Sequence, residues 1–423
     1  MKTSRDCLKV GFPALILFAF ASIMMVAGLS PALGAPGAPI KIGVLAPSTG
    51  PFASYAKDIV DGAQHYVDEI RRDMAGHEVT LMVEDSVETR PDVTLTKARK
   101  LVELDHVDAL VGLVLSSAAL AVRDYVTAQK VPLIITGFAV AEDLTMEKAS
   151  PYVFRATWSS AQIPAAMAKW VRQNLKVRTA TLIATNSVGP QEILMAFARA
   201  FEEAGGKVVQ EIYPPIGTAD MAPFIAAIRR DVDVVATQVV GADGVRFVKQ
   251  YDEYGLKGKI PLVDAAVAFT DVTLLPAEGE SVVGTYNAQA YISTINNPQN
   301  RAFVQAFRTK YKRDPGAPAE ATYVALAAIH QALKESRGIK EDGPKFLAAL
   351  RKVKLDAPRG TFRFDRFQNV ISDVHIGKIE HVGNQVLPRV VATIRDVDQF
   401  LGMNSEEYMK KPRLPTLKGT FGK

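Results

Sequence analysis

The residues that could do chemistry are scattered along this 423-residue chain. The six histidines lie far apart, and His77 with Glu78 lacks the second histidine of a zinc-binding helix. No Gly-x-Ser-x-Gly motif, no phosphate-binding loop and no dinucleotide-binding glycine motif occurs. Glu84 and Asp85 form the best carboxylate pair, yet a turn or capping role suits them better than acid–base catalysis. We therefore predict no enzyme activity, no cofactor and no metal site.

The amino terminus has the pattern of a secretory signal. A short basic stretch precedes an apolar run from Val10 to Leu29, and small residues follow it. This predicts a signal peptide over residues 1–34, cleaved after Gly34, with an uncleaved membrane anchor as the alternative. Cys7 is the single cysteine, and it precedes the apolar run, so it cannot carry a lipid anchor. We expect a periplasmic protein whose mature form has no thiol.

The charges give little support to a nucleic-acid partner. The chain has 50 Lys and Arg against 45 Asp and Glu, a net charge of +5. Residues 1–34 carry +2 of this charge and residues 399–423 carry +3, so the body between them is neutral. Because a basic face is what nucleic-acid binding requires, we expect no such partner.

Short apolar runs alternate with segments of helical periodicity. This alternation predicts an α/β fold with two Rossmann-like lobes, whose parallel sheets are covered by helices. Ligands in such folds bind beyond the carboxyl ends of the strands, here in the cleft between the lobes. We expect strands over residues 40–46, 79–83, 107–111, 131–136, 179–185, 207–212, 232–237, 259–263, 360–364, 374–380 and 386–394. We expect helices over residues 55–72, 91–104, 116–129, 163–174, 191–203, 223–230, 241–254, 300–312, 319–336 and 344–353.

Several motifs then occur in an order that resembles the leucine/isoleucine/valine-binding proteins, the periplasmic solute receptors of ABC importers. The opening run Ile42 to Pro51 (IGVLAPSTGP) carries much of the likeness, with Tyr55 and Gly62 after it. The resemblance covers residues 40–395. Its other matching segments are Val111 to Ser117, Val131 to Thr145, Val153 to Thr157, Phe201 to Gly205, Asp233 to Val235 and Arg359 to Asp365.

The resemblance implies the organisation of the chain. The first lobe would comprise residues 35–157 and 286–364, and the second residues 158–285 and 365–398. Three hinge crossings would join them, near residues 155–159, 284–291 and 362–367. A partly ordered tail, residues 399–423, would follow. The implied partners are a small-molecule ligand and an ABC permease with its cytoplasmic ATPase, and the protein is expected to be a monomer.

The resemblance also implies a ligand site. Ser116 matches the serine that holds the ligand carboxylate, Gly137 the residue whose backbone assists it, and Tyr55 a pocket aromatic. A helix N-terminus at Ser116 favours an anion, although Ser116 and Ser117 could simply cap that helix. The further candidate positions for the pocket are Ser117, Ala139, Asn186, Val188, Gln238 and Asp264.

Two of these positions depart from the family pattern, and the alignment of a third is open by one residue. Ala139 replaces a carboxylate-binding threonine, and Val188 stands where a tyrosine is expected. The acid for the ligand ammonium falls at Asp264 or Ala265. The implied ligand is a small amino acid or a related carboxylate, aromatic ones included. A ligand-sensing regulatory or receptor module on the same fold is the alternative, and an enzyme is the third hypothesis.

Overall fold

The structure, a computed structural model, describes residues 37 to 411. A first sheet has six strands in the order β2-β3-β1-β4-β5-β6, all parallel except the short edge strand β2. The central strands are buried, as expected for a parallel sheet covered by helices. The strands are β1 Gly37–Ala46, β2 Asp73–Met74, β3 His77–Asp85, β4 Ala109–Gly112, β5 Leu133–Ile135 and β6 Val153–Arg155.

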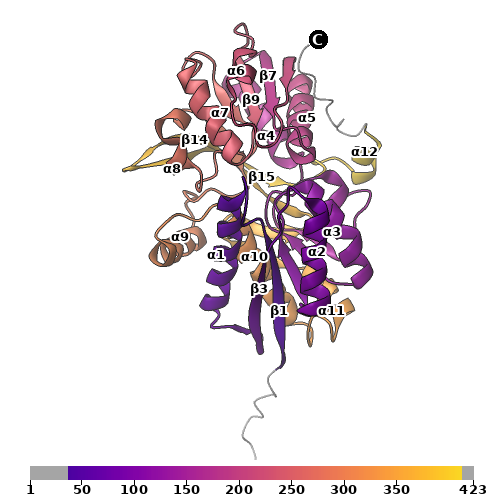
Figure 1. The fold of residues 1–423 in the computed structure, drawn as a ribbon. Helices are drawn as coiled ribbons and strands as arrows, with labels where there is room; N and C mark the ends of the chain where they lie inside the picture. Colours follow the sequence, from indigo (N-terminus) through magenta and orange to yellow (C-terminus); the bar gives the residue numbers. More distant parts are fainter. Residues whose placement is uncertain (1–36, 412–423) are drawn as a thin grey trace, which may run out of the picture. The chain divides into compact units, whose positions relative to one another are not determined.

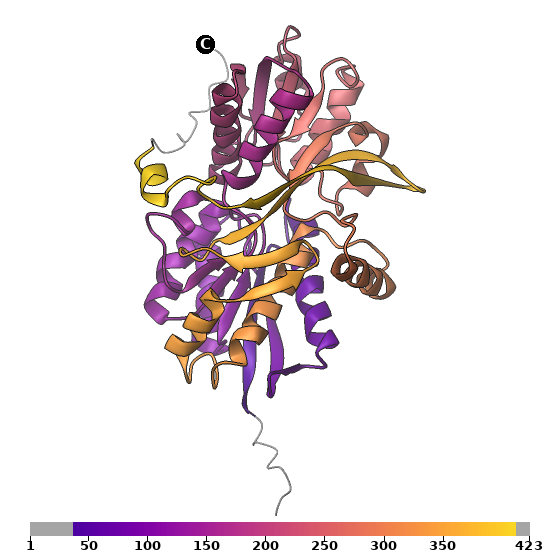
Figure 2. The ribbon, with the colours of Figure 1, turned by 180° about the vertical axis from the view of Figure 1, so that it is seen from behind.

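A second sheet has nine strands. Strands β8, β7, β9, β10 and β11 are parallel, and β14 pairs antiparallel with β11 and with β15. Figure 2 shows β14 and β15 as a long yellow hairpin. The strands are β7 Thr179–Ala184, β8 Lys207–Ile212, β9 Val234–Gln238, β10 Leu262–Asp264, β11 Tyr286–Gln289, β12 Lys354–Ala357, β13 Gly360–Phe364, β14 Val370–Val382 and β15 Gln385–Val397.

Helices alternate with the parallel strands in both halves (Figure 1). The two sheets with their helices, which we call the first and the second lobe, confirm the α/β class expected from the sequence. The helices are α1 Ala53–Glu69, α2 Pro91–Arg99, α3 Ser116–Gln129, α4 Gln162–Asn174, α5 Val188–Glu203, α6 Ala222–Ala226, α7 Ala242–Glu253, α8 Leu275–Glu278, α9 Pro298–Tyr311, α10 Ala317–Leu333, α11 Gly343–Arg351 and α12 Ser405–Lys410. A π-helical turn, Lys100–Leu104, continues α2.

Helix α10 packs directly against α1, although more than 200 residues separate them in the chain. A glycine makes the close approach possible, because a Cβ at Gly62 would lie 2.2 Å from the carbonyl oxygen of Ala319. The late helices therefore return to the part of the fold that the first strands built.

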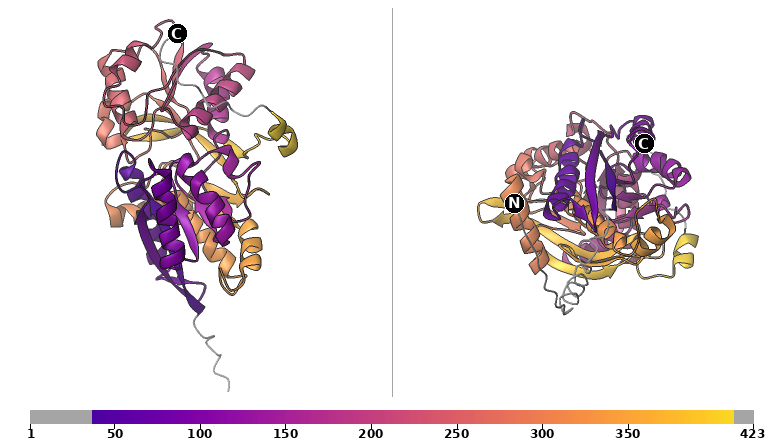
Figure 3. Two further views of the ribbon diagram at one scale, coloured as in Figure 1. Left: turned by 45° about the vertical axis from the view of Figure 1, so that its right-hand side comes forward. Right: turned by 90° about the horizontal axis from the view of Figure 1, so that it is seen from below.

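The chain after residue 398, where a partly ordered tail was expected, is described as far as Lys411, and residues 412–423 lie outside the described residues. Helix α12 is anchored by the buried rings of Phe400 and Tyr408, whose centroids are 5.7 Å apart. The Tyr408 hydroxyl donates to Glu142 at 2.7 Å. In Figures 1 and 3 this yellow helix lies beside α5 and α3. The segment is thus a packed element as far as Lys411.

The predicted signal peptide, residues 1–34, lies outside the described residues. Among those that are described, no helix is long and apolar enough to cross a bilayer. The described part of the chain also holds no group of three or more His, Cys, Asp or Glu side chains that could bind a metal ion.

Candidate ligand-binding site

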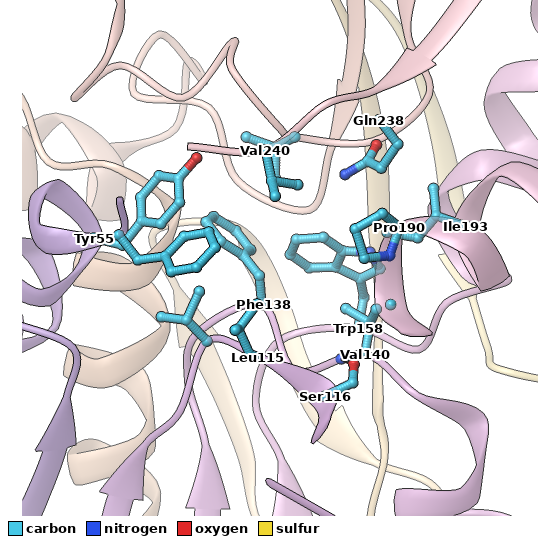
Figure 4. A pocket seen from close by; sticks show the side chains of 14 residues that line it. Tyr55, Leu115, Ser116, Phe138, Val140, Trp158, Pro190, Ile193, Gln238 and Val240 are labelled. Carbon is cyan, nitrogen blue, oxygen red and sulfur yellow. Dashed lines mark hydrogen bonds between the residues drawn. The ribbon is translucent and has the colours of Figure 1, made fainter. Parts of the chain in front are cut away.

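A pocket lies where loops at the carboxyl ends of strands from both sheets meet (Figure 4). Its cavity volume is about 30 Å³. Tyr55, Ser116 and Gln238, three of the positions predicted from the sequence, line it. The other lining residues are Phe52, Val114, Leu115, Phe138, Val140, Trp158, Gly189, Pro190, Ile193, Val240 and Val267.

Four aromatic rings form one wall of this pocket. Phe138 contacts Tyr55 edge-on, with centroids 5.0 Å apart, and Trp158 edge-on at 5.2 Å. Phe52 stacks on Tyr55 at 6.4 Å. Edge-to-face and offset stacking are the favoured geometries of aromatic pairs, so these rings form a rigid surface that could pack against a flat, apolar ligand.

Sequence reasoning missed three of those four aromatic residues. Phe52 stands inside the Pro- and Gly-rich loop after β1, and Phe138 directly follows Gly137. Trp158 is one of two tryptophans and lies just beyond β6. A large aromatic residue in a loop that faces the cleft was the signal that could have identified them.

Ser116 is placed as a hydrogen-bond donor. Its side chain is buried at the start of α3, and its Oγ accepts bonds of 3.1 Å from the backbone N–H groups of both Val140 and Ala141. A hydroxyl has two acceptor sites and one proton. Both acceptor sites are used, so the proton remains to be donated to a ligand oxygen.

Two helices of the opposite lobes begin at the pocket. Leu115 and Ser116 line it from the N-terminus of α3, and Gly189 and Pro190 line it from the first turn of α5. Neither helix has a side-chain cap. Helix N-termini carry partial positive charge, so they favour an anion in a pocket whose described lining has no Lys or Arg.

A buried carboxyl supports the loop before α3. Glu88 Oε2 accepts the backbone N–H groups of Val114 at 2.7 Å and Leu115 at 2.5 Å. Burial raises the pKa of Glu88 to about 7. Glu88 therefore fixes the loop before α3. It uses the N–H groups of Val114 and Leu115, the two residues that precede Ser116.

Asp264, the predicted partner of a ligand ammonium, does not line the pocket. Its Oδ2 accepts bonds from Ala268 N at 2.9 Å and Thr270 Oγ1 at 2.7 Å, and burial raises its pKa to about 7. The Tyr55 hydroxyl donates to the Ala268 carbonyl in the loop so held. Asp264 thus shapes the loop that faces Tyr55 through Oδ2, while its Oδ1 is buried without a hydrogen-bond partner.

The remaining predicted positions also lie outside the lining. Gly137 allows close backbone packing, since a Cβ there would lie 2.4 Å from the Leu113 carbonyl oxygen. Asn186 accepts a bond from Gln191 at 2.5 Å and so shapes the start of α5. Ser117, Ala139 and Val188 are neighbours of the lining residues Ser116, Val140 and Gly189.

Comparisons with known proteins agree with this architecture. Residues 39–384 match the periplasmic binding protein family, and the chain belongs to that family. It is 27% identical to the Leu/Ile/Val-binding protein homolog 6 of Brucella melitensis over 364 residues, 84% of this chain and 89% of the relative. The likeness to leucine/isoleucine/valine-binding proteins noted in the sequence is therefore confirmed.

Two solved structures show the same fold. An ABC transporter substrate-binding protein from Sphaerobacter thermophilus is 32% identical with a TM-score of 0.79, covering 85% of this chain and 99% of that one. A solute-binding protein of an ABC transporter from Rhodopseudomonas palustris BisB5, in complex with 3,4-dihydroxybenzoic acid, is 27% identical with a TM-score of 0.80. The alignment with the second covers 85% of this chain and 98% of that one. The chain is thus a solute-binding protein of the ABC-transporter type.

Proposed function

We propose that this protein is the extracytoplasmic receptor of an ABC importer and that its ligand is a small aromatic carboxylate without an ammonium group. The observation that carries the proposal is the composition of the described lining. It offers four aromatic rings and the Ser116 donor at two helix N-termini, and it includes no Asp or Glu.

An α-amino acid would need a partner for its ammonium group. Leaving a buried ammonium unpaired costs several kcal/mol, which is why amino-acid sites supply an acid. The nearest predicted acid, Asp264, is engaged by backbone and hydroxyl donors of its own loop. A ligand with a carboxylate and an apolar ring would bring no ammonium charge that this lining leaves unpaired.

The R. palustris neighbour supports this ligand class, because it was solved with 3,4-dihydroxybenzoic acid. Its 27% identity extends over nearly its whole chain. The leucine-type relatives support an amino acid instead, whereas the lining, which has no Asp or Glu, favours the carboxylate.

The closed arrangement of the cleft supports a receptor that closes on its ligand. The Tyr55 hydroxyl from the first lobe donates to the Ala268 carbonyl in the second. Ala242 N donates to the Pro51 carbonyl at 3.3 Å. A ligand that contacts both lobes favours this closed state over an open one, and closure is what a permease can recognise.

Location, partners and lobe boundaries belong to the same proposal. The signal pattern of residues 1–34 supports export to the periplasm, where a permease with its ATPase would receive the ligand. We retain the proposed lobes except at strands of the second sheet that fall within residues 286–364: β11, which pairs with β10, and β12 and β13, which join that sheet through β14.

A thermal-shift screen of the mature protein tests this function. Benzoate and its ring-hydroxylated forms should raise the melting temperature, and leucine, isoleucine and valine should leave it unchanged. Stabilisation by the branched-chain amino acids alone would contradict the proposed ligand class. No stabilisation by any carboxylate or amino acid would contradict the receptor function.

A further inference from the structure

Two lining residues of the pocket carry buried polar atoms that have no hydrogen-bond partner. They are the indole nitrogen Nε1 of Trp158 and the amide oxygen Oε1 of Gln238. Both residues are only 2% exposed. A buried polar atom without a partner destabilises the folded state, so each one in a native structure calls for an explanation.

The two atoms have opposite hydrogen-bonding character. An indole N–H can only donate, and an amide oxygen can only accept. A hydroxyl group both accepts and donates, so a single hydroxyl between these side chains would satisfy both of them. In Figure 4 the indole of Trp158 lies between Gln238 and Ser116, away from Tyr55.

We propose that Trp158 and Gln238 form a second polar subsite in the pocket, which recognises a hydroxyl group on the ring of the ligand. This inference rests on the proposed function, in which Ser116 and the helix N-termini hold the carboxylate. This subsite would then distinguish a hydroxylated aromatic carboxylate from the same acid without the hydroxyl group.

The ring of Trp158 and the backbone of Gln238 are held in place by contacts that do not involve a ligand. The ring of Trp158 packs edge-on against Phe138, and its carbonyl accepts a bond from Arg155 Nη1 at 3.4 Å. Gln238 ends strand β9, where its carbonyl accepts the N–H of Thr185 at 3.1 Å. A preorganised donor and acceptor lose little entropy when the ligand arrives.

Gln238 ends strand β9 of the second sheet, and Trp158 lies just after β6, at the crossing between the lobes.

Calorimetric titration with benzoate and its 2-, 3- and 4-hydroxy forms tests the inference. At least one isomer should bind about tenfold more tightly than benzoate, since it satisfies two otherwise unpaired atoms. Trp158→Phe and Gln238→Leu should each remove most of this advantage, measured within each variant as the ratio of the affinities for the hydroxy isomer and for benzoate. Trp170→Phe is the matched control. Trp170 lies on α4, where it packs against Tyr286 of β11, and it does not line the pocket.

The outcomes separate the inference from the function on which it rests. The hydroxyl subsite is wrong, and the receptor function stands, if benzoate binds and no hydroxy isomer binds more tightly. The same holds if the tighter binding of a hydroxy isomer survives both substitutions. If wild-type protein binds neither benzoate nor any isomer, both are wrong. Circular dichroism of each variant confirms that a lost advantage is not a loss of folding.

Discussion

The pocket and the crossings between the lobes use polar groups in opposite ways. At the crossings, polar side chains bind groups from distant segments of the chain. Arg155 donates to the carbonyls of Val140 at 2.5 Å and Ala141 at 3.1 Å, and Gln162 Nε2 donates to the carbonyl of Val370 at 2.9 Å. In the pocket, the Ser116 proton, the Trp158 N–H and the Gln238 oxygen have no acceptor or donor among the described residues.

Unpartnered buried atoms occur at the crossings as well, at Arg155 Nε, Ser159 Oγ and Asn369 Oδ1, but those in the pocket belong to residues that line a cavity. A buried polar group that binds another part of the chain fixes geometry, and its loss should reduce stability. A group left unpaired in a pocket reduces stability in the free protein and contributes to affinity when the ligand binds. Substitutions in the two regions should therefore have separable effects.

The largest expected effect is at a buried ion pair beside the crossings. Arg359 and Glu320 are both almost fully buried and bind each other, and Arg359 Nη1 also donates to the Ala156 carbonyl at 2.7 Å. Glu320→Gln leaves the arginine charge unpaired, so the free energy of unfolding should fall by about 3 to 5 kcal/mol in denaturant titrations.

The matched control for that change is Arg229→Ala, which breaks an ion pair on the surface. It should alter the free energy of unfolding by less than about 1 kcal/mol. Equal losses from the two substitutions would mean that the crossings are not held together by buried polar contacts.

The next effect is a dependence of the free energy of unfolding on pH, caused by Glu192. Glu192 Oε2 accepts bonds from Glu142 N at 3.1 Å and Ser160 Oγ at 2.8 Å. Burial raises the pKa of Glu192 from 4.5 to about 7. The folded chain then keeps a proton that the unfolded chain releases, so the free energy of unfolding should fall as pH rises through this window and level off above it.

Glu192→Gln should remove the part of this dependence that Glu192 contributes, while Glu88 and Asp264 keep theirs. The difference in unfolding free energy between the variant and wild type should grow in favour of the variant by roughly 2 to 3 kcal/mol across that pH range. Glu202→Gln, an exposed substitution on the same helix, should show no such slope. A difference that stays constant with pH would show that Glu192 is ionised in the folded protein.

In the pocket, Ser116→Ala should weaken benzoate binding by about 1 to 3 kcal/mol, because it removes the buried donor to the carboxylate. Ser117→Ala is the control, since Ser117 lies outside the lining. Calorimetry measures both. Equal affinities for wild type and Ser116→Ala would mean that Ser116 only holds the backbone of Val140 and Ala141 and does not bind the ligand.

The smallest expected effect is that of Gly189→Ala, which should change ligand affinity without lowering the stability of the protein. A Cβ at Gly189 would lie 2.9 Å from Ser116 Oγ, so Gly189→Ala should displace the hydroxyl and weaken benzoate binding by about 1 kcal/mol. Because alanine favours a helix more than glycine does, the melting temperature should stay the same or rise. A fall in melting temperature with unchanged affinity would contradict this placement.

Most of the fold could be predicted from the sequence because its parallel strands are short apolar runs between amphipathic helices. Strand β11 could not, since its sequence, Tyr286 to Gln289, is polar. Asn287 and Gln289 are buried there because they donate to the hydroxyl and carbonyl of Thr270, which is distant in sequence. Such a strand is recognisable only once its partners are known.

The site could be predicted in part. Tyr55, Ser116 and Gln238 follow from the position of loops at strand ends. The role of Asp264 could not be foreseen, because the direction of a carboxyl group depends on the loop folded around it. The ring contacts of Phe138 with Tyr55 and Trp158 likewise depend on tertiary packing.

The central claim is that the pocket accepts a carboxylate and rejects an ammonium group. The most direct test is calorimetric titration with two acids that share a skeleton, 3-phenylpropanoate and phenylalanine, repeated with 4-methylpentanoate and leucine. The acid without the ammonium group should bind more tightly in each pair, by a factor of about a hundred, since an unpaired buried charge costs several kcal/mol. Tighter binding of phenylalanine or leucine than of its deaminated counterpart would contradict the account.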